Sequence, residues 1–158
     1  MIKISPSILS VDLLKLEDEI KYLEQSGADY IHIDIMDGHY VPNITFGANI
    51  VKSVRSISSK TLDVHLMMSP VKPFVEDFIK AGADIVSFHP EADINSIEII
   101  ETINRFNVKS GIAIHPNKNV SDFEHLLSNV KQVIVMTVVP GFGGQKFMID
   151  QVKKIKEL

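Results

Sequence analysis

The residues with the clearest chemical potential lie in the run His32-Ile33-Asp34-Ile35-Met36-Asp37-Gly38. His32 and Asp34 are two residues apart, so a strand would place both side chains on one face, where they can act as a pair of metal ligands. The surrounding isoleucines predict that this strand is buried. Because buried polar groups need a partner, the pair predicts either hydrogen bonds within the core or a bound cation.

A further histidine, His65, lies in a second apolar run, where it shares a face with Asp63 and Met67. Taken alone, a histidine in such a run is more often hydrogen-bonded in the core than a metal ligand. If the two runs form neighbouring strands, His65 joins His32 and Asp34 in a set of two imidazoles and one carboxylate. That donor set suits Zn, Fe or Mn.

A glycine-rich segment, Pro140-Gly141-Phe142-Gly143-Gly144-Gln145, follows the last apolar run. Glycines without a Cβ let backbone N–H groups approach an anion closely, as in phosphate-binding loops. An ordinary strand-to-helix turn would have the same composition. The segment by itself therefore leaves both interpretations open.

Short β-rich runs alternate with longer amphipathic stretches along the whole chain. The pattern predicts strands at residues 2–5, 30–34, 61–65, 85–89, 109–114 and 132–136. It predicts helices at residues 13–26, 48–56, 71–81, 94–106, 120–127 and 150–158. This alternation is typical of an α/β fold with parallel strands and crossover helices, and residues 1–158 are expected to form a single domain.

A local repeat supports the alternation of helices and strands. Gly27 and Gly82 each follow a predicted helix and precede Ala-Asp and an apolar strand. Aligning the two glycines places Asp34 opposite His89. The strands therefore deliver polar groups to equivalent places near their carboxyl ends, where catalytic groups lie in (β/α) barrels and open parallel sheets.

The composition narrows the class of protein. The 158 residues are 45% hydrophobic and carry a formal net charge of −4, so no basic surface for nucleic acid or anionic lipid is expected. There is no cysteine, which excludes disulfides and thiolate chemistry. The first residues lack a signal-peptide core, and no apolar run approaches the roughly 20 residues needed to cross a bilayer. We therefore expect a cytoplasmic protein with neither membrane nor nucleic-acid partners.

Five segments in order resemble the ribulose-phosphate 3-epimerase family. They are Ser5-Pro6-Ser7-Ile8-Leu9-Ser10, the run from His32 to Asn43, Asp63-Val64-His65-Leu66-Met67, Phe88-His89-Pro90-Glu91 and the glycine-rich segment. The resemblance implies a TIM (β/α)8-type barrel, of which this chain would hold about six βα units. It also implies interconversion of D-ribulose 5-phosphate and D-xylulose 5-phosphate in the pentose phosphate pathway, with one divalent cation: Zn2+, Fe2+, Mn2+ or Co2+.

The resemblance also assigns roles to residues. His32, Asp34 and His65 would ligate the metal, and Asp34 would also be an acid/base catalyst that acts through an enediolate. The small-molecule sugar phosphate would contact Ser7, His65, Gly141, Phe142, Gly143 and Gly144, while Met36, Met67 and Met136 would flank the reacting carbons.

The chain differs from the family mainly in length. Family members are longer, and the part that follows Leu158 in them holds two further barrel strands and a second acid/base aspartate. We therefore expect either a part of a longer protein or a fragment with little activity. Two other functions stay open: an epimerase for a related sugar such as allulose 6-phosphate, and an inactive partial barrel that acts only by association. A homo-oligomer is expected in each case.

Overall fold

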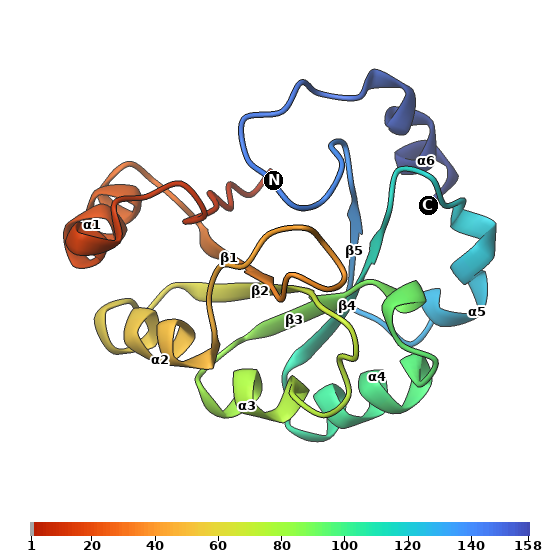
Figure 1. Ribbon diagram of the computed structural model, residues 1–158, viewed down its shortest axis with the longest axis horizontal. Helices are drawn as coiled ribbons and strands as arrows, with labels where there is room; N and C mark the ends of the chain where they lie inside the picture. Colours follow the sequence, from red (N-terminus) through yellow and green to blue (C-terminus); the bar gives the residue numbers. More distant parts are fainter. Residues whose placement is uncertain (1) are drawn as a thin grey trace.

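A computed structural model describes residues 2–158 and shows one sheet of five parallel strands surrounded by helices (Figure 1). Each strand pairs with the next one along the chain, in the order β1-β2-β3-β4-β5. Parallel neighbours need a crossover connection, and a helix fills each one. The strands are β1 (Tyr30–Met36), β2 (Thr61–Met67), β3 (Ile85–Phe88), β4 (Lys109–Ile114) and β5 (Gln132–Val135).

The helices lie on the outer side of the sheet (Figure 1). They are α1 (Leu16–Gln25), α2 (Ala48–Ile57), α3 (Val75–Lys80), α4 (Ser96–Arg105), α5 (Glu124–Leu127) and α6 (Val152–Glu157), with short 3-10 turns at Leu13–Lys15, Pro90–Ala92, Val120–Phe123 and Ile149–Gln151. The helix predicted at residues 71–81 begins only at Val75. Pro73 explains the delay, because proline disfavours helical backbone at the residue before it.

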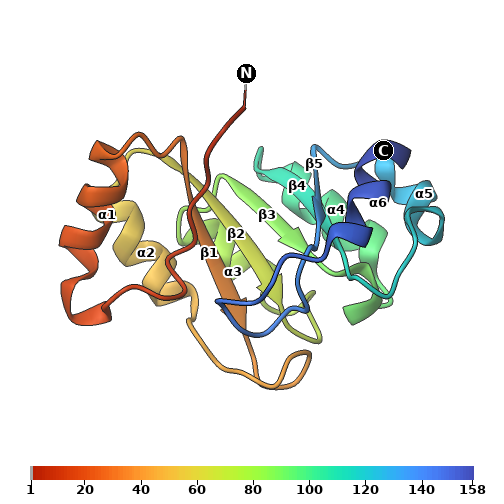
Figure 2. The same cartoon turned by 90° about the horizontal axis from the view of Figure 1, so that it is seen from above.

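The strand predicted at residues 2–5 is wrong in detail, since the structure has no strand there. The chain instead runs beside β1 (Figure 2), and Ser7, which follows this segment, forms an isolated bridge with His32. The carbonyl of Ile4 accepts from the N–H groups of Asp29 and Tyr30. Pro6 interrupts regular pairing because it has no N–H to donate, although its carbonyl accepts from His32 and Ile8 donates to the His32 carbonyl.

One face of the sheet packs against the helices, and the opposite face carries the polar residues of the site. On β1 the alternate residues Ile31, Ile33 and Ile35 are buried in the main apolar core, which they share with Val51 and Val54 of α2. The intervening residues of β1 point to the opposite, inner face. The helices thus hold the sheet through one face and leave the other face for the site.

The repeat predicted around two glycines is present. Gly27 after α1 and Gly82 after α3 both have positive φ values, +92° and +110°, that side chains with a Cβ rarely adopt. Of these two glycines, Gly82 is the crowded one, because a Cβ there would lie 2.5 Å from Cγ of Arg55. Arg55 cannot move freely, since its guanidinium donates to Asp84 at 2.9 Å and to the Lys60 carbonyl at 3.0 Å.

The two glycines therefore predict different losses of stability. Gly27→Ala is expected to lower the free energy of unfolding by about 1 kcal/mol, the cost of the left-handed backbone alone. Gly82→Ala adds the collision with Arg55, and its total loss is expected to be about 2–3 kcal/mol. Urea denaturation of both variants measures the difference. Equal losses would mean that Arg55 yields at no cost.

Candidate functional site

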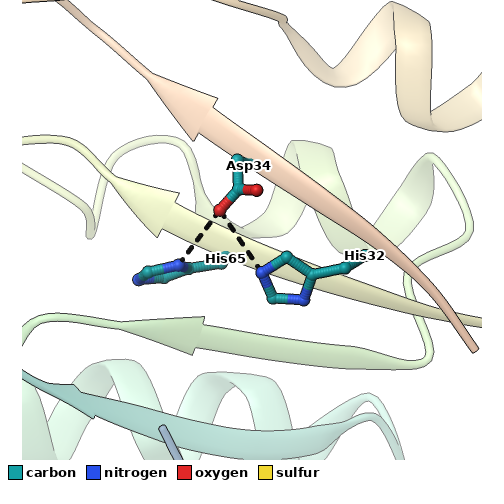
Figure 3. A group of neighbouring side chains, drawn as sticks. All are labelled: His32, Asp34 and His65. Carbon is teal, nitrogen blue, oxygen red and sulfur yellow. Dashed lines mark ion pairs between the residues drawn. The ribbon is translucent and has the colours of Figure 1, made fainter. Parts of the chain in front are cut away.

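The inner face of β1 and β2 brings together the three predicted metal ligands. The parallel register pairs Asp34 with His65, and His32 lies two residues before Asp34. Nε2 of His32 and Nδ1 of His65 each lie 3.3 Å from the same oxygen, Oδ1 of Asp34 (Figure 3). The ligand atoms of all three residues lie within 4.8 Å of one another. The structure thus contains a triad compatible with a divalent cation.

The outward nitrogen of His32 is held by a second carboxylate. Nδ1 of His32 lies 2.9 Å from Oδ2 of Asp63, its register partner on β2. The other oxygen of Asp63 accepts from Nε2 of Gln132 on β5 at 3.0 Å. A histidine held at one nitrogen by a carboxylate presents the other in a fixed direction, the common arrangement of metal-binding histidines.

The side chain of Gln132 can extend across the sheet to Asp63 because Gly111 of β4 has no side chain. A Cβ at Gly111 would lie 2.2 Å from Oγ of the buried Ser87 and 3.2 Å from Cβ of Gln132. The glycine leaves the space through which the Gln132 amide passes to Asp63. Gln132 thereby supports Asp63, which in turn holds His32.

The charges of the triad follow from its contacts. Although burial opposes a charge on His32, hydrogen bonds to Asp34 and Asp63 raise its pKa to about 10. Burial likewise opposes a charge on Asp34, but its contacts with the two histidines hold the pKa of this carboxyl well below its usual range. His65 is completely enclosed, and burial lowers its pKa to about 4. At neutral pH, without a metal, His32 is therefore cationic, Asp34 anionic and His65 neutral.

Asp34 also faces a hollow of about 310 Å3 above the triad. Its second oxygen accepts from the hydroxyl of Ser7, on the segment beside β1. The glycine-rich segment forms the opposite wall, where Asn43 donates to the Gly141 carbonyl at 2.8 Å. The predicted substrate residues that line this hollow are Ser7, Met36, Met67, Met136, Gly141, Phe142, Gly143 and Gly144. Of the predicted set, only the enclosed His65 does not line it.

Sequence reasoning did not identify the partners of the two imidazoles. The sequence predicts that Asp63 shares a face with His65, which is a usable signal, but it does not predict the contact of Asp63 with His32. Gln132 gave no signal, because it contacts a residue 69 positions away. His89 aligned with Asp34 in the repeat, and the structure places its ring against His65, with the two Nε2 atoms 3.1 Å apart.

Comparison with known proteins agrees with this geometry. The profile of the Ribulose-phosphate 3 epimerase family matches residues 3–158. The chain belongs to this family of isomerases. The ribulose-phosphate 3-epimerase of Bacillus subtilis is 49% identical over 158 residues, which cover all of this chain and 73% of that protein. The enzyme of the same name from Rhodobacter capsulatus is 45% identical over 157 residues, covering 99% of this chain and 68% of that one.

A solved structure supports the TIM-barrel character of this epimerase-family chain. The N-acetylmannosamine-6-phosphate 2-epimerase of Clostridium perfringens superposes with a TM-score of 0.66 at 10% identity. The superposition covers 98% of this chain and 70% of that one. At such low identity the likeness concerns the fold alone. It confirms that the five βα units are arranged as in a TIM barrel.

The neutral, buried His65 predicts a loss of stability in mild acid. Its pKa is about 4 in the folded chain, against an ordinary value of 6.5 in the unfolded chain. Unfolding therefore takes up a proton at pH values between these two. The neutral His65 therefore contributes fully to the free energy of unfolding above pH 6.5. This contribution is lost as the pH falls toward 4, and the total loss is about 3 kcal/mol. Urea denaturation between pH 4 and 7, with a chelator present, should show a shallower pH dependence for His65→Gln than for the unchanged chain.

The matched control for this measurement is His125→Gln, on an exposed ring of α5. It is expected to keep the pH dependence of the unchanged chain. Parallel stability curves for all three proteins would contradict the assignment of a neutral, buried imidazole at position 65.

Proposed function

We propose that this chain epimerises D-ribulose 5-phosphate at C3 to give D-xylulose 5-phosphate, the reaction that gives its relatives their name. The observation that carries the proposal is the position of Asp34. One of its oxygens contacts both imidazoles of the triad, and the carboxylate also borders the hollow closed by the glycine-rich segment. A base, a cation site and a loop suited to an anion thus meet at one place.

Epimerisation requires removal of the proton at C3, next to the C2 carbonyl, and its return on the opposite face. Asp34 is proposed as the base for one face, because its lowered pKa keeps it ionised. The hydroxyl of Ser7 donates to the same carboxylate and would fix its orientation toward the hollow. The proton passes to Asp34, and the first step leaves an enediolate whose negative charge lies on the C2 oxygen, next to the C3 hydroxyl.

His32, Asp34 and His65 are proposed to hold one divalent cation. Two imidazole nitrogens and a carboxylate oxygen suit Zn2+, Fe2+, Mn2+ or Co2+, and the lowered pKa values of His65 and Asp34 keep both in ligating form. When bound, the cation would supply Lewis-acid stabilisation of the negative charge that develops on the C2 oxygen. His32 must release its proton before it can ligate, because its pKa is raised.

The rest of the hollow suits the remainder of the substrate. Met36, Met67 and Met136 are proposed as an apolar wall that limits water around the enediolate. Backbone N–H groups of residues 141–144 are proposed to bind the phosphate end. A cytoplasmic location and a homo-oligomeric state stay predictions. No helix among residues 2–158 is long and apolar enough to span a membrane.

The second face of C3 needs its own proton donor. Asp34 is the one ionisable side chain among residues 2–158 that lines this hollow. The two halves of the reaction can therefore be measured separately. Loss of the C3 proton to solvent reports the Asp34 face, and formation of the epimer reports both faces.

The deciding experiment follows ribulose 5-phosphate by NMR in D2O, with and without an added diamagnetic divalent metal such as Zn2+. Metal-dependent exchange at C3 is expected, and Asp34→Asn should slow it by at least 100-fold because the base is lost. Asp18→Asn, on an exposed part of α1, is the control with unchanged exchange. Exchange with epimer formation supports the full reaction, whereas exchange alone supports the Asp34 half. No exchange with metal bound, or turnover of allulose 6-phosphate in its place, would overturn the proposal.

The glycine-rich segment predicts a steric effect on binding. A Cβ at Gly143 would lie 3.1 Å from Oγ of Ser10, so Gly143→Leu forces bulk into the narrow space where the segment meets residues 7–10. The Kd for ribulose 5-phosphate, measured by calorimetry, is expected to rise about tenfold, or 1.4 kcal/mol. Phe147→Leu, outside the hollow, is the control. Unchanged affinity in Gly143→Leu would mean that the segment is an ordinary turn.

A further inference from the structure

His89 lies directly after β3 and has no exposed surface. Its Nε2 is 3.1 Å from Nε2 of His65, with ring centres 5.0 Å apart. The ring of Tyr40 covers His89 at 4.9 Å between centres. His89 is thus a buried polar group that contacts His65 of the proposed metal site, on the side of the His65 ring that faces away from Asp34.

The far nitrogen of His89 faces a carboxylate. Among residues 2–158, Nδ1 of His89 has no hydrogen-bond partner, and the nearest acidic oxygen is Oε1 of Glu91 at 3.7 Å. The Tyr40 hydroxyl donates to that same oxygen at 3.1 Å, which holds Glu91 in place. Four side chains therefore form one row: Asp34, His65, His89 and Glu91.

The number of protons in this row limits their arrangement. A neutral imidazole carries a single N–H, whereas the row holds two imidazoles and three contacts. The central contact needs one proton, because two ring lone pairs 3.1 Å apart would repel each other. The remaining proton lies at one end, either on His65 facing Asp34 or on His89 facing Glu91.

We propose that His89 is a positioning residue that fixes His65 as a metal ligand. A nitrogen that carries a proton cannot ligate, so a cation at Nδ1 of His65 requires the arrangement with the end proton beside Glu91. His65 then donates its Nε2–H to His89, and His89 turns its Nδ1–H toward Glu91. This inference rests on the proposed metal site and extends it to His89 and Glu91, which touch neither metal nor sugar.

Two substitutions separate this role from simple packing. His89→Gln keeps an acceptor for the His65 proton, whereas His89→Leu keeps bulk but offers none. The Kd for Zn2+, measured against a competing chelator, is expected to rise 10- to 100-fold in His89→Leu and less than threefold in His89→Gln. The control is His115→Leu, whose ring centre is 6.2 Å from that of His89 but which accepts from the Asn117 backbone instead.

The outcomes distinguish the two proposals. Equal Zn2+ affinity in His89→Leu and the unchanged chain, together with loss of binding in His65→Ala, would overturn the role of His89 and leave the metal site standing. A chain that binds no Zn2+, or binds it equally well as His65→Ala, would remove the metal site and the role of His89 with it.

A second measurement needs no variant. In the unchanged chain loaded with Zn2+ and labelled with 15N-histidine, NMR should place the proton of His65 on Nε2. It should also show a 15N–15N coupling to Nε2 of His89 across the hydrogen bond. A His65 proton on Nδ1, or a missing coupling, would overturn the proposal even if both His89 variants fail to fold.

Discussion

Because β1 and β2 pair in parallel with Asp34 beside His65, three pairs of side chains share the inner face of the sheet: His32 with Asp63, Asp34 with His65, and Met36 with Met67. A slip of one residue would turn one member of each pair toward the helices. The apolar residues between them prevent the slip, since Ile33 and Val64 are completely buried on the helix side. The chemistry of the site is thus fixed by a packing requirement on the opposite face.

The register also sets the electrostatics. Buried charges are costly unless each has a partner, and here every ring nitrogen of His32 and His65 faces a specific group. Two carboxylates next to one cationic imidazole leave an excess of negative charge on the inner face. That excess favours a divalent cation, while the neutral His65 adds a ligand without adding charge.

Local patterns were sufficient for most of the architecture. The five strands were predicted within two residues at each end, because alternation of polar and apolar residues reports burial directly. Pro6 and Pro73 account for two of the differences, a missing strand and a late helix, since proline acts on backbone hydrogen bonding and conformation rather than on hydropathy. The helices predicted from residues 13 and 120 instead begin with 3-10 turns at Leu13–Lys15 and Val120–Phe123. The triad followed from the period of the strands. Its supporting contacts depend on side-chain directions across several strands, which no local pattern contains.

Gly111 shows how the packing around the site limits which substitutions its residues can accept. Ser87, Gly111 and Gln132 occupy one row across β3, β4 and β5, and each leaves just the space that the others need. A larger residue at position 111 is tolerable only if positions 87 and 132 change with it, and a change at 132 releases Asp63. The three positions therefore form a single unit of variation. A redesign of this protein for another sugar can vary the residues that line the hollow, whereas Ser87, Gly111 and Gln132 have to be exchanged together.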